Sequence, residues 1–204
     1  MANEVRNQIR FIGNKHVSDC MIEINRRLQL DNNPNDPNGL GKIGRVLYGL
    51  EGDASFLSYD QVGGKWIYYD FDDDDTLVVF TGWDPARKFQ DYLLSKISTL
   101  DPNVIIAMEC DDEGPGFVGV RYVTMKDSQV FSYEREIDTS ELKIVDMFEV
   151  EDTKSELMSE GDESEVISWD DLWEKQKDLL AYAYRELKNN FPHAYPDPSL
   201  RFRS

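Results

Sequence analysis

The sequence predicts an α+β fold: an antiparallel sheet with two helices on one face, plus a C-terminal amphipathic helix. Short apolar runs of strand length recur at 77–81, 104–108 and 117–122. Apolar residues recur at three- and four-residue spacing in two further segments, at 17–28 and 85–100. Because an amphipathic helix buries one face, both segments should pack on the sheet, and we expect them on the same side.

The N-terminal third of the chain predicts a strand, a helix and a loop. A strand is expected at 7–12, where polar and apolar residues alternate until Gly13. The helix at 17–28 comes next. Residues 31–39 are rich in Asn, Pro and Gly and predict a loop. Residues 40–64 show no clear period and fit either short strands or turns.

The middle of the chain predicts a hairpin and a capped helix. A strand at 66–69 should lead through an acidic run at the hairpin tip into the strand at 77–81, because like charges there remain in water. In the helix that follows, Asp84 suits the N-cap and Pro85 the first helical position. Further strands are expected at 104–108, 117–122, 129–136 and 142–150.

The last quarter of the chain predicts a linker and a helix. Residues 151–165 contain seven carboxylates and one lysine and indicate a flexible linker. We therefore divide the chain into a domain at 1–150, an acidic flexible linker at 151–167, and a helix with a tail at 168–204.

Ser168 can cap that helix, whose apolar stripe includes two tryptophans. Burying such side chains is worth about 1.5–3 kcal/mol each. The helix should therefore dock on its own chain; self-association through it is the second alternative and a partner protein the third.

Composition limits the class of partner. The formal net charge of −18 disfavours direct binding to nucleic acid or to an anionic membrane and favours a partner with a basic surface. Apolar runs fall short of the roughly 20 residues of a membrane span, and the N-terminus lacks a signal-peptide core. Cys20 and Cys110 form neither a disulfide framework nor a zinc site. We expect a soluble protein of the cytoplasm.

The motifs point to no catalytic residues, no cofactor and no metal. Two segments match G-x-G-x-x-G, at 39–44 and 114–119, but neither connects a strand to a helix N-terminus, where backbone N–H groups would meet a pyrophosphate. The acidic run starting at Asp70 lacks the Gly and Glu of a calcium loop. His16 and His193 have no nucleophile or ligand at suitable spacing.

Candidate partner-binding residues are acidic clusters and tryptophans near element ends. They are Asp72, Asp73, Asp74, Asp75, Trp83, Asp111, Asp112, Glu113, Trp169 and Trp173. Trp66 and Trp83 border a predicted strand pair and fit core packing best, because each ring buries a large apolar area. A binding role for these two rings is the alternative.

Four sequence features suggest a family. They are the strand Asn7-Gln8-Ile9-Arg10-Phe11-Ile12-Gly13, then Gly63-Gly64-Lys65-Trp66, then Phe80-Thr81-Gly82-Trp83-Asp84-Pro85 before a helix, and Glu113-Gly114-Pro115-Gly116-Phe117-Val118-Gly119 before a strand. In order and spacing, residues 3–136 resemble the YubB-like ferredoxin-like domain family of phages, prophages and plasmids. The sequence departs from the family at Pro85-Ala86, where two prolines are usual.

The resemblance implies a ferredoxin-like sandwich of phage or mobile-element origin, and it transfers no catalytic residues. We therefore expect a non-enzymatic accessory protein in the host cytoplasm that binds and modulates or inhibits a host protein. One form of this hypothesis is acidic mimicry directed at a nucleic-acid-binding or defence protein, which requires ordered charges because DNA has one about every 1.7 Å. The alternatives are a small-ligand-binding protein or enzyme with a cleft near Trp66 and Trp83, and a virion or assembly protein.

Overall fold

The computed structural model describes residues 4–30, 67–73, 75–112, 116–160 and 164–200. Its elements are β1 (Glu4–Ile12), α1 (Lys15–Leu30), β2 (Ile67–Asp73), β3 (Thr76–Gly82), α4 (Arg87–Ile97), β4 (Ile105–Asp112), β5 (Phe117–Lys126), β6 (Gln129–Asp138), β7 (Leu142–Val145), η3 (Met147–Glu149), α5 (Val150–Glu160), β8 (Glu165–Ser168), α6 (Trp169–Asn190) and η4 (Pro198–Leu200). The α+β class and the antiparallel sheet are confirmed. The expected loop at 31–39 and the segment 40–64 lie outside the described residues.

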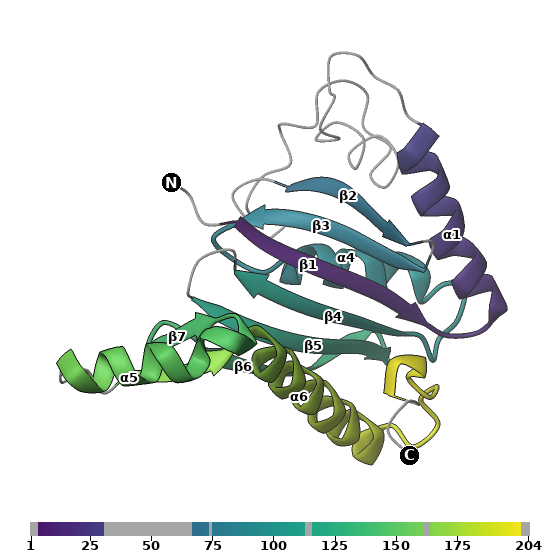
Figure 1. Ribbon diagram of the computed structural model, residues 1–204. Coiled ribbons are helices and arrows are strands. Elements are labelled where there is room, and N and C mark those ends of the chain that lie inside the picture. Colours follow the sequence, from purple (N-terminus) through teal and green to yellow (C-terminus); the bar gives the residue numbers. More distant parts are fainter. Residues whose placement is uncertain (1–3, 31–66, 74, 113–115, 161–163, 201–204) are drawn as a thin grey trace.

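Six strands form one sheet in the order β2-β3-β1-β4-β5-β6, and every neighbouring pair is antiparallel (Figure 1). The first four strands with α1 and α4 follow a βαββαβ path with β1 and β3 in the centre of that unit. This arrangement is compatible with a ferredoxin-like α+β class. β5 and β6 continue the sheet beyond β4.

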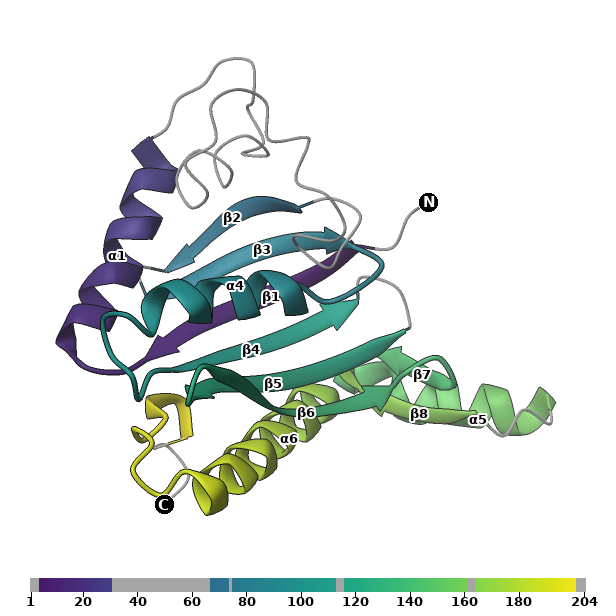
Figure 2. The ribbon, with the colours of Figure 1, turned by 180° about the vertical axis from the view of Figure 1, so that it is seen from behind.

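Helices α1 and α4 pack on the same face of the sheet (Figure 2). Alternate residues of β1 point to this face, since side chains along a strand alternate between the two sides. Ile9 and Phe11 belong there to one buried cluster with Val17 of α1 and Phe89 of α4. The two amphipathic stripes predicted from sequence thus close one side of the sheet.

Helix α6 covers part of the opposite face, over β5 and β6 (Figure 1). Leu180, Ala183 and Leu187 pack there against Val120 and Tyr122 of β5 in a second buried cluster. The side chain of Gln176 donates hydrogen bonds to the carbonyl oxygens of Cys110 and Gly119, at 3.2 and 3.3 Å. The helix therefore docks on its own chain, which was the first of the three alternatives.

The start of α4 differs from the sequence prediction. Its N-cap is Ala86, and Asp84 lies instead in a turn where the hydroxyl of Thr81 donates to the Asp84 carbonyl oxygen at 2.6 Å. The buried N–H of Ala86 donates to Oδ1 of Asn7 at 2.9 Å. A side chain from β1 thus takes the place of a local cap.

The segment expected to be an irregular linker contains regular structure. Residues 150–160 form α5, and β8 pairs in parallel with β7, so that Ile144 lies opposite Ile167. The strand expected at 142–150 ends at Val145. Two physical causes explain the difference. Glu, Lys, Leu and Met favour helix and acidic residues suit its first turn. The apolar pair Val166-Ile167 gains energy by burial.

Within the described ranges, every helix is too short or too polar to cross a membrane.

Candidate partner-binding site

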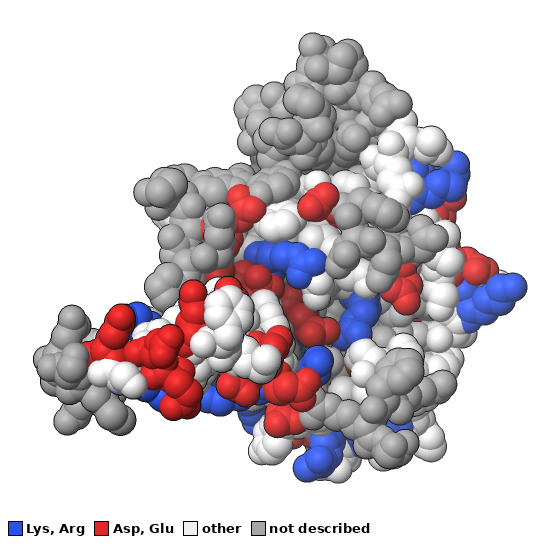
Figure 3. All heavy atoms as spheres, in the orientation of Figure 1, with Lys and Arg blue, Asp and Glu red and all other residues white. Residues whose placement is uncertain are grey.

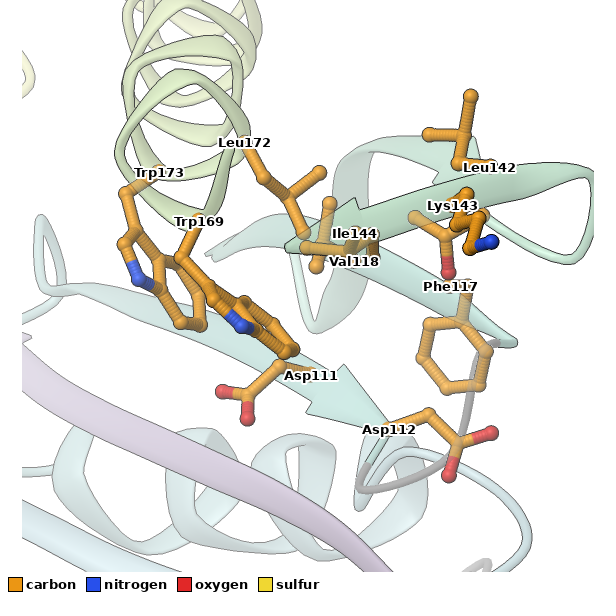
Figure 4. A pocket seen from close by; sticks show the side chains of 11 residues that line it. Asp111, Asp112, Phe117, Val118, Leu142, Lys143, Ile144, Trp169, Leu172 and Trp173 are labelled. Carbon is orange, nitrogen blue, oxygen red and sulfur yellow. The ribbon is translucent and has the colours of Figure 1, made fainter. Parts of the chain in front are cut away.

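A pocket with a volume of about 540 Å³ lies where the start of α6 meets the ends of β4 and β5 and the strand β7 (Figure 4). Its apolar floor consists of Val118, Leu142, Ile144 and Leu172. Val118 and Leu172 are buried and belong to a third cluster with Ile167 of β8. The parallel pairing of β7 with β8 brings these distant segments together.

Two tryptophans form one wall of the pocket. Trp169 is the first residue of α6, and Trp173 follows one helical turn later on the same face. Their rings stack with centroids 5.9 Å apart and an interplanar angle of 24°. Trp169 remains 42% exposed although it is large and apolar. An exposed, ordered aromatic surface at the edge of a pocket is typical of a binding site.

A capping box fixes the position of these rings. Ser168 Oγ accepts a hydrogen bond from the backbone N–H of Asp171 at 3.0 Å, and the side chain of Asp171 accepts from the N–H of Ser168. Ser168 also ends β8, where it is paired with Val145 of β7. The first turn of α6 is therefore held both by its own cap and by the strand pair.

Asp111 and Asp112 form the acidic side of the pocket, at the end of β4. In Figure 4 the carboxylate of Asp111 lies beneath the two indoles, and Asp112 lies across the pocket beside Phe117. A Cβ atom at position 116 would be 2.2 Å from Asp112 Oδ2, so a larger residue there would displace the Asp112 carboxylate.

Burial raises the pKa of Asp111 to about 6. The nearby Arg6 opposes this shift, whereas Glu109 and Asp112 reinforce it. Of the described residues that line the pocket, Lys143 alone is cationic. The pocket therefore combines two carboxylates, one ammonium group and an aromatic wall, with more negative than positive charge.

A second hollow of about 510 Å³ adjoins the pocket and shares Asp111 and Trp173 with it. It lies between β1 and α6 on the same face of the sheet. Glu109 lines this hollow and accepts a hydrogen bond of 2.6 Å from Arg10, and burial raises the pKa of Glu109. Figure 3 shows acidic residues around an uncharged patch over the first part of α6.

The structure brings four of the sequence-predicted site residues together: Asp111, Asp112, Trp169 and Trp173. The acidic run that includes Asp72, Asp73 and Asp75 lies at the β2–β3 turn, at the opposite end of the sheet. Asp74, Glu113 and Trp66 fall outside the described residues.

Trp83 lies at the same end of the sheet as Asp112, since Gly82 pairs with Glu4 and Asp112 pairs with Val5. It is 54% exposed, has a positive φ of 71°, and does not line the pocket at the start of α6 or the hollow beside it. A core role for this ring is therefore wrong.

Sequence reasoning missed Phe117, Lys143 and the apolar floor. Phe117 and Val118 reach the pocket from the start of β5 and Leu172 from α6, and the β7–β8 pairing brings Leu142, Lys143 and Ile144 to it. The available signal was Val166-Ile167, a short apolar pair after the acidic stretch that matches Ile144-Val145 in length. Among the described residues, no group of three or more His, Cys, Asp or Glu side chains is placed to hold a metal.

Comparison with protein-family models, curated proteins and solved structures finds no match to this chain.

Proposed function

We propose that this chain is a non-enzymatic binding protein that engages a basic partner protein through the pocket at the start of α6. The observation behind the proposal is the stacked pair Trp169 and Trp173 beside Asp111. Aromatic faces and carboxylates both attract cations, and tryptophan is enriched among the residues that dominate binding energy. The volume of about 540 Å³ lies within the range of pockets for small ligands or short peptide segments.

The net charge of −18 supports the same partner class. An acidic surface accelerates encounter with a basic partner, and this effect weakens as salt rises. The fuller proposal is that the chain is a ferredoxin-like protein of the YubB-like family from a phage or mobile element. In the host cytoplasm it would inhibit the protein that it binds by covering that protein's basic surface.

Acidic mimicry of nucleic acid by one continuous stripe is the less favoured form. The aspartates at the β2–β3 turn and those at the end of β4 lie at opposite ends of the sheet. A pocket that receives part of the partner requires only the second group. The alternative of a small-ligand-binding protein or enzyme with a cleft near Trp66 and Trp83 is less favoured, because Trp83 does not line the pocket at the start of α6 and Trp66 lies outside the described residues.

The test is binding of defined peptides of equal length with basic, neutral or acidic composition to the full chain, measured by fluorescence anisotropy at low and physiological salt. We expect only the basic peptides to bind, and we expect the Trp169→Ala variant to lose this binding. Trp83→Ala is the matched control, because it removes another exposed tryptophan outside the pocket. Equal binding of all peptides, or equal loss in both variants, would refute the proposal.

A further inference from the structure

Resting on the proposed function, we propose that the pocket binds an arginine side chain of the partner together with an apolar residue two positions away in the same extended segment. The guanidinium would lie on the exposed ring of Trp169 and pair with Asp111. The apolar residue would lie on the floor formed by Val118, Ile144 and Leu172.

The charge of the occupant follows from the pocket's own groups. Asp111 and Asp112 lie on opposite sides, with Lys143 as the described cation among the lining residues. Asp111 is partly buried close to Glu109, so its negative charge is poorly solvated. A cation placed next to Asp111 stabilises its negative charge by Coulomb attraction, in place of the water that solvates an exposed carboxylate. Arg6 already offsets part of this charge, and an anionic occupant would be repelled by Asp111 and Asp112.

The shape of the site favours guanidinium over ammonium. Guanidinium is planar, weakly hydrated, and both stacks on aromatic rings and binds carboxylates through two parallel hydrogen bonds. In Figure 4 the indole pair lies directly above the Asp111 carboxylate, so one flat cation can contact both. A lysine ammonium is more strongly hydrated and loses more on entering a half-buried site.

The volume indicates that a single side chain does not fill the pocket. The cavity of about 540 Å³ has its carboxylates at the edge and apolar side chains at its base, two of them buried. In an extended peptide, side chains two positions apart point to the same side, so an arginine on the indoles can be accompanied by an apolar residue two positions away on the floor. The combination would give specificity beyond net charge, because a basic segment without the apolar residue leaves the floor empty.

The occupant is assigned to a partner protein and not to a second copy of the chain. Two molecules of charge −18 repel each other, whereas a basic partner is attracted. Within one molecule, Leu180, Ala183 and Leu187 of α6 are already buried against its own sheet, so that this part of the helix is unavailable for self-association.

The experiment uses the full chain and four short peptides that differ at two positions separated by one common residue, written for these two positions as Arg-Leu, Lys-Leu, citrulline-Leu and Arg-Ser. Binding is followed by tryptophan fluorescence and by calorimetry. We expect Arg-Leu to bind more tightly than Lys-Leu, and about 3- to 30-fold more tightly than citrulline-Leu, the range of an aromatic–cation contact. Citrulline-Leu, which has the same shape without the charge, and Arg-Ser should both bind more weakly than Arg-Leu.

Protein variants locate the contact. Asp111→Asn should reduce Arg-Leu affinity and leave citrulline-Leu unchanged, whereas Asp152→Asn, which removes an exposed carboxylate on α5, should change neither. Equal affinity for Arg-Leu and Lys-Leu would overturn the arginine assignment while basic peptides still bind, and the proposed function would stand. If no basic peptide binds, both the arginine assignment and the proposed function are overturned. Concentration-dependent dimerisation of the chain that Trp169→Ala abolishes would assign the pocket to a second copy instead.

Discussion

The hydroxyl of Tyr122 donates a hydrogen bond of 2.5 Å to Oδ2 of Asp197. Tyr122 lies in the centre of β5, and Asp197 belongs to the tail after α6. The other oxygen of Asp197 accepts hydrogen bonds from the backbone and side chain of Ser199. Asp197 is only 2% exposed, so the tail is fixed to the sheet through a buried carboxylate with satisfied partners.

We predict that Tyr122→Phe lowers the free energy of unfolding by about 1–3 kcal/mol, because it leaves the buried Asp197 oxygen without this donor. Urea unfolding at neutral pH measures the change. Tyr182→Phe is the control: that ring is exposed on α6 and keeps its contact with Arg135. Equal stability of the two variants would contradict the prediction.

Asn7 should be a second sensitive position. Its amide donates to the Val79 carbonyl oxygen and the Thr81 hydroxyl, and its Oδ1 accepts from Ala86 at the start of α4. Asn7→Leu leaves a buried N–H unsatisfied, so we expect a loss of about 1–3 kcal/mol. Asn190→Ala, at the exposed end of α6, serves for comparison in the same urea titration. An Asn7 variant as stable as wild type would show that α4 does not depend on this cap.

The capping box of α6 gives a third prediction. Ser168→Ala removes the acceptor for the Asp171 N–H, and N-cap losses cost about 0.5–2 kcal/mol. Ser155→Ala on α5, whose exposed hydroxyl donates to the Glu151 carbonyl, should have a much smaller effect. Thermal unfolding distinguishes the two. A larger loss for Ser155→Ala would contradict the assignment of Ser168 as the cap.

The raised pKa of Asp111 predicts a pH dependence of stability. Unfolded aspartate titrates near pH 4, but folded Asp111 titrates near 6, so the folded state binds the proton more tightly. The contribution of Asp111 to the free energy of unfolding is thus complete below about pH 4 and is lost as pH rises from about 4 to about 6. Asp111→Asn should remove that decline and be more stable than wild type at pH 7.

Urea unfolding at several pH values between 4 and 8 tests this. The groups that face Asp111 are Arg6, Glu109 and Asp112, and Lys143 lines the same pocket. Asp152→Asn, which removes an exposed carboxylate, should retain the wild-type pH slope. Parallel slopes for wild type and Asp111→Asn would show that this carboxyl does not titrate as described.

Helix α5 should exchange its amide hydrogens faster than α6. Leu157 is the buried residue among the described side chains of α5, whereas α6 buries Leu172, Gln176, Leu180, Ala183 and Leu187. Local opening of α5 therefore exposes little apolar area and costs little free energy. Hydrogen exchange followed by mass spectrometry makes the comparison. Equal protection in the two helices would show that α5 has further stabilising contacts.

Much of the fold could be predicted from local patterns. Polar and apolar residues alternate along β1, α1 and α4 have apolar stripes, and Ser168 precedes a long amphipathic segment. Each of these signals depends only on residues that are close in sequence. The role of Asn7 could not be predicted in this way, because its partner Ala86 is 79 residues away. The charge of the segment 151–165 suggested disorder, but repulsion among exposed carboxylates in water is weak enough for helix propensity to prevail.

Half of the candidate site was within reach of the sequence. Trp169 and Trp173 were recognisable because a helix places residues four apart on one face. Their proximity to Asp111 depends on where α6 docks, and the floor depends on the β7–β8 pairing. Neither relation has a local signature, so the acidic and aromatic candidates could be named but not grouped.

Helices from distant parts of the chain pack on the two faces of the sheet, and this has a consequence for biosynthesis. Residues up to 138 include every strand of the sheet with α1 and α4, so the first core can form while the polypeptide is still emerging from the ribosome. The opposite face, with Val120 and Tyr122, stays open until residues 180–187 have been translated. Nascent chains should therefore present a transient apolar surface to chaperones, and prematurely terminated products should be directed to proteolysis.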